Sequence, residues 1–125
     1  GILSIIASKL GAKNVLGIDN DEVTIPVAEE NAKINNISNC TFKNCEINGI
    51  TEKFDFITAN ILHNVLVDIM GDLVRIMKDD AKVVLSGILN TKANVVKNAI
   101  DKYNLKIKET IELDQWIGFV VEKRR

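Results

Sequence analysis

The sequence is poor in the residues that mark secreted, metal-binding and membrane proteins. Its 125 residues include two cysteines, Cys40 and Cys45, which are too few for a disulfide framework. The single histidine, His63, does not complete a set of zinc ligands with them. No apolar run approaches the roughly 20 residues that a membrane-spanning helix needs, and no signal-peptide pattern is present. We therefore expect a cytoplasmic protein in which both cysteines are small buried side chains.

An excess of positive charge is also lacking. Sixteen basic residues stand against 17 acidic ones, and the formal net charge is −1. Nucleic-acid binding depends on a basic surface that neutralises phosphates, so this composition disfavours it. The short run at residues 122–125 contains three basic side chains and is typical of solvated surface.

Linkers, internal repeats and low-complexity tracts are absent too, and the chain has one proline, Pro26. Hydrophobic residues make up 46% of the sequence, which is enough to build one core in a chain of this length. We expect a single domain that spans residues 1–125.

What the sequence does contain is an alternation of two kinds of apolar segment. Short apolar runs predict buried parallel strands, whereas segments with apolar residues three and four positions apart predict helices. We predict strands at residues 15–18, 40–43, 54–59 and 81–88, and helices at residues 2–10, 21–35, 61–77 and 93–103. This alternation is typical of an α/β domain with a mostly parallel sheet.

The last part of the chain departs from this alternation. Residues 106–111 alternate polar with apolar side chains, and a second apolar segment follows at residues 116–121. Asp114 and Gln115 lie between them and predict a turn, so we expect the chain to end in an antiparallel hairpin.

Several candidate binding residues stand at the ends of predicted strands. In open parallel sheets, ligands bind beyond the carboxyl ends of the strands. Asp19, the Cys45–Glu46 loop, Asn60 and Gly87 should therefore converge on one edge of the sheet. Gly1 opens the first predicted helix, where a glycine lets a cofactor approach backbone N–H groups.

Asp19 is the most informative of these residues. A carboxylate at the end of this strand can accept hydrogen bonds from both hydroxyls of a ribose, which indicates nucleoside binding. The alternative is that Asp19 caps the helix that follows, a common role for acidic residues.

Asn60 lies between an apolar strand and an apolar helix, which is an unusual place for an amide. Its carbonyl could accept a hydrogen bond from an amine, and its nitrogen could donate one. An N-terminal helix cap explains the residue equally well, so the sequence leaves both possibilities open. His63 has no carboxylate or thiol partner at a useful spacing and is interpreted as a helix-face side chain.

Six short segments together resemble a known family. They lie at residues 1–5, 17–19, 30–32, 54–55, 59–62 and 85–89. The sequence resembles the catalytic domain of the ribosomal protein L11 methyltransferases over nearly its whole length. The most specific part of the resemblance is Ala-Asn-Ile-Leu at 59–62 combined with Ser-Gly-Ile-Leu at 86–89.

The resemblance implies a Rossmann-like, S-adenosylmethionine-dependent methyltransferase fold. It also implies transfer of a methyl group to amino groups of a ribosomal protein, without a metal. In such a domain, Asp19 holds the cofactor ribose and the Cys45–Glu46 loop borders the adenine. Asn60 lies beside the methionine end and the incoming nitrogen, and Gly1 is the last glycine of the cofactor loop.

The family also has a strand and a glycine-rich turn before the position of Gly1, preceded by a substrate-recognition domain. We expect this first strand to be missing from the chain. Because it would lie at the centre of the sheet, we expect unpaired backbone groups on both strands beside it.

Two other functions stay open on the sequence. A nicotinamide-dinucleotide oxidoreductase would also place an acid at the end of this strand. Alternatively, the chain is a non-catalytic fragment whose exposed sheet centre pairs with a second copy.

Overall fold

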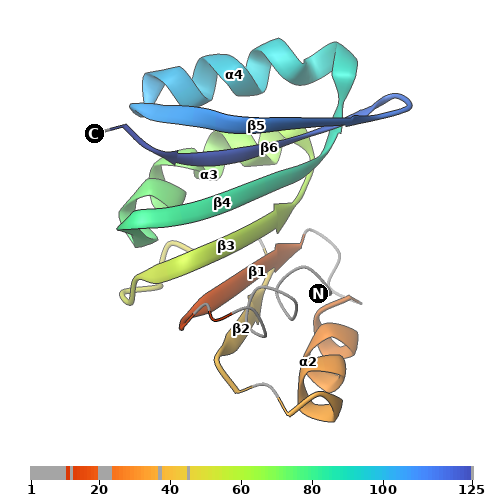
Figure 1. Cartoon of the computed structure of the whole chain (residues 1–125), viewed down its shortest axis with the longest axis vertical. Coiled ribbons are helices and arrows are strands. Elements are labelled where there is room, and N and C mark those ends of the chain that lie inside the picture. The colour runs from red at the N-terminus through yellow and green to blue at the C-terminus, as the bar shows by residue number, and fades with distance from the viewer. Residues whose placement is uncertain (1–10, 12, 20–23, 37, 45, 125) are drawn as a thin grey trace.

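The structure, a computed structural model, describes residues 11, 13–19, 24–36, 38–44 and 46–124. These residues form a six-stranded mixed sheet packed against helices, as Figure 1 shows. The helix predicted at residues 2–10 lies outside the described residues, as do Gly1 and Cys45. None of the described helices is long and apolar enough to cross a membrane.

The strand order confirms the predicted fold class. The strands are β1 (Val15–Asp19), β2 (Cys40–Lys43), β3 (Phe54–Asn60), β4 (Met77–Leu89), β5 (Leu105–Leu113) and β6 (Trp116–Lys123). They lie in the order β2-β1-β3-β4-β6-β5, in which the first four are parallel and β6 is antiparallel to both β4 and β5. A parallel sheet that ends in an antiparallel hairpin is the arrangement predicted from the sequence.

A helix follows each of the strands β1, β3 and β4. These helices are α2 (Thr24–Ile34), α3 (His63–Ile76) and α4 (Ala93–Lys102), with a short 3-10 turn at Asn90–Lys92. The prediction for residues 77–80 was incomplete, because β4 begins directly after α3 and runs longer than residues 81–88.

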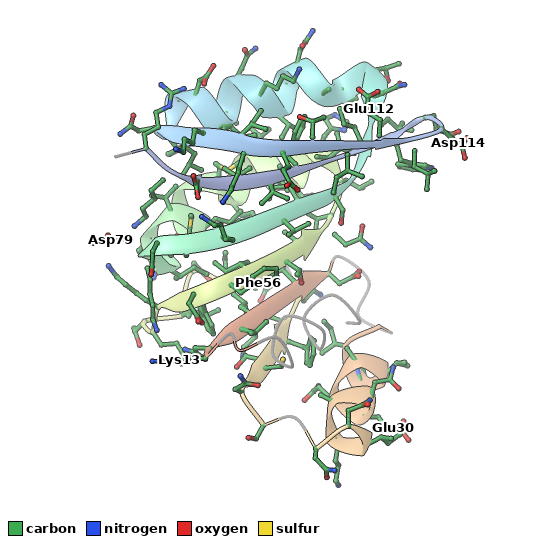
Figure 2. All side chains as sticks on the ribbon, viewed as in Figure 1. Lys13, Glu30, Phe56, Asp79, Glu112 and Asp114 are labelled. Carbon is green, nitrogen blue, oxygen red and sulfur yellow. The ribbon has the colours of Figure 1, made fainter. Side chains whose placement is uncertain are left out.

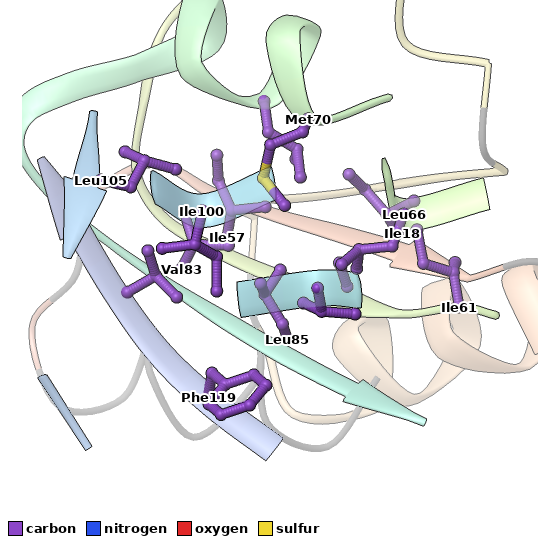
Figure 3. Packing of buried hydrophobic residues seen from close by; sticks show 14 of the residues in the cluster. Ile18, Ile57, Ile61, Leu66, Met70, Val83, Leu85, Ile100, Leu105 and Phe119 are labelled. Carbon is purple, nitrogen blue, oxygen red and sulfur yellow. The ribbon is translucent and has the colours of Figure 1, made fainter. Parts of the chain in front are cut away.

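The main core lies between the sheet and helices α3 and α4. Four buried residues, three or four positions apart, form one face of α3: Leu66, Met70, Leu73 and Ile76. They belong to one cluster with Ile57, Leu85 and Phe119 of the sheet, part of which Figure 3 shows. Burying a side chain of this size stabilises the fold by about 1.5–3 kcal/mol, so this cluster holds α3 against the sheet.

Helix α2 packs separately against the edge strand β2. Ala28 and Ala32, which the sequence places on one helix face, form a small buried cluster with Phe42. Cys40 packs against this cluster and is partly buried, close to its predicted role as a small apolar side chain.

The centre of the sheet corrects one expectation. Strands β1 and β3 pair directly, with Val15 opposite Phe56 and Asp19 opposite Asn60. Their backbone groups therefore bond to each other, and the expectation of unpaired groups on these two strands is wrong. The exposed sheet centre invoked for pairing with a second copy is likewise not found on β1 and β3.

Asp55 fastens the start of β1 to the start of β3. Its carboxylate oxygens accept hydrogen bonds from the backbone N–H groups of Lys13, at 2.8 Å, and of Asn14, at 2.6 Å. Asn14 in turn donates from its side chain to the carbonyl of Lys53, at 3.0 Å. Burial alone would raise the pKa of the Asp55 carboxyl, but these backbone donors lower it overall.

The hairpin of β5 and β6 completes the sheet. Asp114 at its tip, labelled in Figure 2, adopts a left-handed backbone with φ of 54°, which suits a two-residue hairpin turn. Across the strands, Glu122 forms ion pairs with Lys82 and Lys106. Hydrogen bonds from the Lys82 and Lys106 ammonium groups lower the pKa of Glu122 to about 2.

Candidate functional site

Three polar residues form a row across the carboxyl ends of neighbouring parallel strands. Asp19 of β1 lies opposite Asn60 of β3, and Asn60 lies opposite Ser86 of β4. In Figure 1 the arrowheads of β1 and β3 lie side by side at this edge. Since neighbouring strands are about 4.8 Å apart, one small molecule can contact all three residues. The structure thus brings together Asp19 and Asn60, the two main residues predicted from the sequence.

Asp19 is the last residue of β1 and is partly buried. Helix α2 begins at Thr24, five positions after Asp19. The position of Asp19 at a strand end fits a residue that accepts hydrogen bonds from a ligand at the sheet edge.

Asn60 is exposed at the end of β3. The N-cap of α3 is Leu62, and no side chain caps this helix. The capping explanation for Asn60 is therefore wrong, although the sequence favoured it as strongly as ligand binding. Its amide is available for hydrogen bonds with a ligand at this edge.

Gly87 lies close to the Asn60 side chain. Its backbone is left-handed, with φ of 78°, and the ladder between β4 and β6 shifts register between Leu85 and Ile88. A Cβ added to Gly87 would lie 2.6 Å from Oδ1 of Asn60, closer than real Cβ contacts allow. A residue with a side chain would therefore displace the amide. The sequence predicted the place of Gly87 at this edge but not a role for it, and Ser86 was not predicted as a site residue.

Glu46 is exposed in the loop that follows β2, the strand next to β1. The loop is anchored just after Glu46 by the buried side chain of Ile47 and by Arg75 of α3. The Arg75 guanidinium donates to the carbonyls of Ile47 at 3.1 Å and Asn48 at 3.5 Å, and also to that of Ile50. These contacts fix the loop that follows Glu46, and no pattern in the sequence indicates the part that Arg75 plays.

An open apolar pocket of about 210 Å³ lies beside the row, on strands β4, β5 and β6. Its lining consists of Val84, Ser86, Gly87, Ile111, Leu113, Trp116, Ile117 and Gly118. Ser86 and Gly87 belong to this lining and also neighbour Asn60, so the pocket is continuous with the row. The pocket could not be predicted from the sequence, because β4 is distant in the chain from the β5–β6 hairpin that completes the lining.

The remaining chemistry-bearing residues do not form a second centre within the described residues. His63 is the first residue of α3 and is half-buried, in agreement with a helix-face side chain. No group of three or more His, Cys, Asp or Glu side chains among the described residues could hold a metal ion.

The chain is similar to one family over almost its whole length. The model of the family described as "Ribosomal protein L11 methyltransferase (PrmA)" matches residues 1–124. Ribosomal protein L11 methyltransferase of Halalkalibacterium halodurans is 38% identical over 124 residues, which cover 98% of this chain and 40% of the relative. That of Caldicellulosiruptor bescii is 39% identical over 123 residues, with the same coverage. The chain therefore spans about two fifths of these relatives' length.

Solved structures give the same result. The ribosomal protein L11 methylase of Lactobacillus delbrueckii subsp. bulgaricus superposes with a TM-score of 0.84 at 32% identity, covering 100% of this chain and 65% of that one. A methyltransferase from Pyrococcus furiosus superposes with a TM-score of 0.71 at 18% identity, covering 96% and 67%, and it supports the fold alone.

Proposed function

The chain belongs to the ribosomal protein L11 methyltransferase (PrmA) family, and we propose that it forms the cofactor-binding part of a protein N-methyltransferase. The reaction is transfer of a methyl group from S-adenosylmethionine to amino groups of a ribosomal protein, L11 by analogy with the relatives. The observation that carries this proposal is the in-register pair of Asp19 and Asn60 at the carboxyl edge of the sheet.

The residues at this edge fit the two polar ends of S-adenosylmethionine. The Asp19 carboxylate would accept hydrogen bonds from both ribose hydroxyls. Glu46, with Cys45 before it, would border the adenine, because their loop follows the strand next to β1. Gly1 would approach the cofactor through its backbone, as the last glycine of the cofactor loop.

Asn60 would orient the incoming amine beside the methyl group. S-adenosylmethionine supplies a methyl group on a positively charged sulfur, which a neutral amine takes by direct displacement as the carbon–sulfur bond breaks. The Asn60 carbonyl can accept a hydrogen bond from an N–H of this amine and so align the nitrogen lone pair. The amide does not act as a base, so the proton released by the methylated nitrogen passes to water.

The apolar pocket beside Asn60 supports this chemistry. An alkyl amine is mostly protonated near neutral pH, and its protonated form cannot attack. Trp116, Leu113 and Ile111 present apolar surface next to the row, where burial disfavours the charged form of an amine. The pocket would therefore help the site to hold the substrate amine in its neutral form and exclude water.

The proposed function also implies a compartment and a partner for the protein. The proposed compartment is the cytoplasm, where ribosomal proteins are made, and the proposed partner is a protein rather than a nucleic acid. Residues 1–125 are proposed to act as one domain. The oxidoreductase alternative is not favoured, because the chain belongs to a methyltransferase family.

Calorimetry with S-adenosylmethionine tests the ribose role of Asp19. The complete protein encoded by the reading frame that contains this chain is compared with its Asp19→Ala and Asp79→Ala variants. Asp79 is an exposed carboxylate at the opposite end of β4, labelled in Figure 2, and serves as the matched control. We expect Asp19→Ala to weaken binding by about 10- to 100-fold, the value of one or two charge-assisted hydrogen bonds, and Asp79→Ala to leave it unchanged. Equal affinities for the three proteins would remove the assignment.

The fragment alternative has its own test, motivated by the share of the relatives that the chain spans. Cofactor binding and methyl transfer to L11 are measured for the 125-residue chain and for the complete protein. If both proteins bind the cofactor but only the complete protein transfers the methyl group, the chain binds the cofactor and requires other segments for catalysis.

A further inference from the structure

The absence of a side chain at Gly87 leaves space for the amide of Asn60. The three atoms nearest to a Cβ on Gly87 would be Oδ1 of Asn60 at 2.6 Å and the backbone O and N of Ile61 at 3.4 and 3.5 Å. The side-chain oxygen is thus the nearest atom to the space that glycine leaves empty. The Asn60 amide occupies part of that space.

The Asn60 amide needs such a support. The last torsion of an asparagine side chain is broad, so the amide rotates easily unless a neighbour restricts it. Within the described residues, no hydrogen bond from another side chain holds it, and α3 uses Leu62 rather than Asn60 as its N-cap. The backbone of Gly87 lies close enough to Oδ1 to limit where this atom can lie.

We propose that Gly87 is a positioning residue for methyl transfer. By lacking a side chain, it lets the Asn60 amide lie back against β4, in line with Asp19 and Ser86. A side chain at position 87 pushes Oδ1 out of this row and misaligns the amine, while the ribose contact at Asp19 is unaffected. This inference rests on the proposed role of Asn60 as the residue that orients the amine.

The chain offers two matched controls for Gly87→Ala. Gly11 also has a left-handed backbone, with φ of 109°, but a Cβ there meets no atom within 4 Å. Gly11→Ala therefore carries the backbone strain of alanine at positive φ without a clash. Gly118 lines the same pocket, and a Cβ there would lie 3.2 Å from the carbonyl oxygen of Leu85, so Gly118→Ala gives crowding away from Asn60.

The first readout is the NMR signal of the Asn60 side-chain amide, measured in the complete protein and its three variants. We expect Gly87→Ala to shift this signal, and Gly11→Ala and Gly118→Ala to leave it in place. An unshifted signal in Gly87→Ala would overturn the proposal. This measurement does not depend on catalysis, so it tests the contact separately from the proposed function.

The second readout is methyl transfer in a double-mutant cycle. We expect Gly87→Ala to lower kcat by at least tenfold while the Kd for S-adenosylmethionine changes by less than twofold. In the Asn60→Ala background, Gly87→Ala should have no further effect on kcat, because the displaced amide is already gone. Equal losses in both backgrounds would indicate a purely structural glycine and overturn the proposal. A shifted amide signal with unchanged kcat in Gly87→Ala would retain the contact but overturn the positioning role of Gly87, whereas an unchanged kcat in Asn60→Ala would reject the proposed function of Asn60.

Folding supplies a third test if Gly87→Ala is insoluble. Asn60→Ala removes the atom nearest to the new Cβ, so the double variant Asn60→Ala/Gly87→Ala should recover soluble protein. If Gly11→Ala is soluble, so that backbone strain at positive φ is tolerated, failure to recover the double variant would place the clash elsewhere and contradict the proposal.

Discussion

Oδ1 of Asn60 lies only 2.6 Å from the position that a Cβ on Gly87 would occupy, so a side chain of β3 rests against the bare backbone of β4. The contact lies at the edge where Asn60 is also opposite Asp19. The backbone of Gly87 therefore limits the position of the amide in the middle of the row, while the carboxylate of Asp19 lies at one end of it. This division suggests that cofactor binding and amine alignment can be separated by mutation.

Substitution of Asn60 should reveal that separation. Asn60→Ala removes the proposed hydrogen bond to the amine, so we expect kcat for methyl transfer to fall by about 10- to 100-fold. The Kd for S-adenosylmethionine, measured by calorimetry, should change much less than in Asp19→Ala. Asn60→Asp keeps the size of the side chain but introduces a charge, which stabilises the protonated amine and should also lower kcat. A loss of cofactor affinity equal to that of Asp19→Ala would contradict the assignment.

Direct pairing of β1 with β3 predicts a pattern of amide exchange. Successive N–H groups of a strand with two neighbours point alternately to one neighbour and to the other. If both neighbours are present, consecutive amides along β1 and β3 should exchange slowly in hydrogen-exchange NMR of this chain. Strand β5, at the edge of the described sheet, provides the internal reference, because we expect slow exchange at only every second amide. The same alternate pattern in β1 would mean that its side toward β3 is open.

Features of the fold that depend on neighbouring residues in the chain could be predicted from the sequence, whereas features that depend on distant segments could not. Local periodicity was enough to predict β1, β3 and the terminal hairpin, and the parallel arrangement then predicted that Asp19 and Asn60 share an edge. The direct pairing of β1 with β3 could not be predicted in this way, because it depends on which strands are near each other in space.

The candidate site shows the same limit at the level of side chains. The choice between capping and ligand binding for Asn60 depended on where α3 begins, and only the structure gives Leu62 as its N-cap. The Arg75 contacts to the loop at residues 47–50 join segments about 25 residues apart, and no short-range pattern reports them. Backbone geometry at Gly87 is equally invisible in the sequence, where many glycines serve turns alone.

The Asp55 carboxylate should matter for stability more than its position near the surface suggests. Asp55→Ala leaves the N–H groups of Lys13 and Asn14 without their acceptor, so we expect a loss of about 1–3 kcal/mol in the free energy of unfolding. Asp55→Asn keeps one acceptor oxygen and should lose less. Urea unfolding measures both, with Asp79→Ala as the control, since that side chain is fully exposed. A loss no larger than that of Asp79→Ala would show that the clamp contributes little.

Glu122 should make the free energy of unfolding depend on pH in the acid range. Its pKa in the folded chain is about 2, below its ordinary value of 4.5, because the Lys82 and Lys106 ammonium groups bond to the carboxylate. A group with a lowered folded pKa stabilises the fold above the unfolded value and loses this contribution as pH falls through the folded value. Stability should therefore decline between about pH 4.5 and pH 2, and E122Q should decline less over that range.

An NMR titration of the Glu122 carboxyl separates this effect from general acid unfolding. Lys106→Met removes one of the two ammonium partners, so we expect the pKa of Glu122 to rise toward 4.5. Lys108→Met, on the same strand but outside the ion pairs, is the matched control and should leave the pKa of Glu122 low. If Lys106→Met leaves that pKa unchanged, the Lys106 ion pair does not act on Glu122 in solution, and Lys82 alone must account for the low value. If the Glu122 carboxyl has a pKa near 4.5 in the unmodified chain and in both lysine variants, the cross-strand ion pairs do not stabilise the sheet.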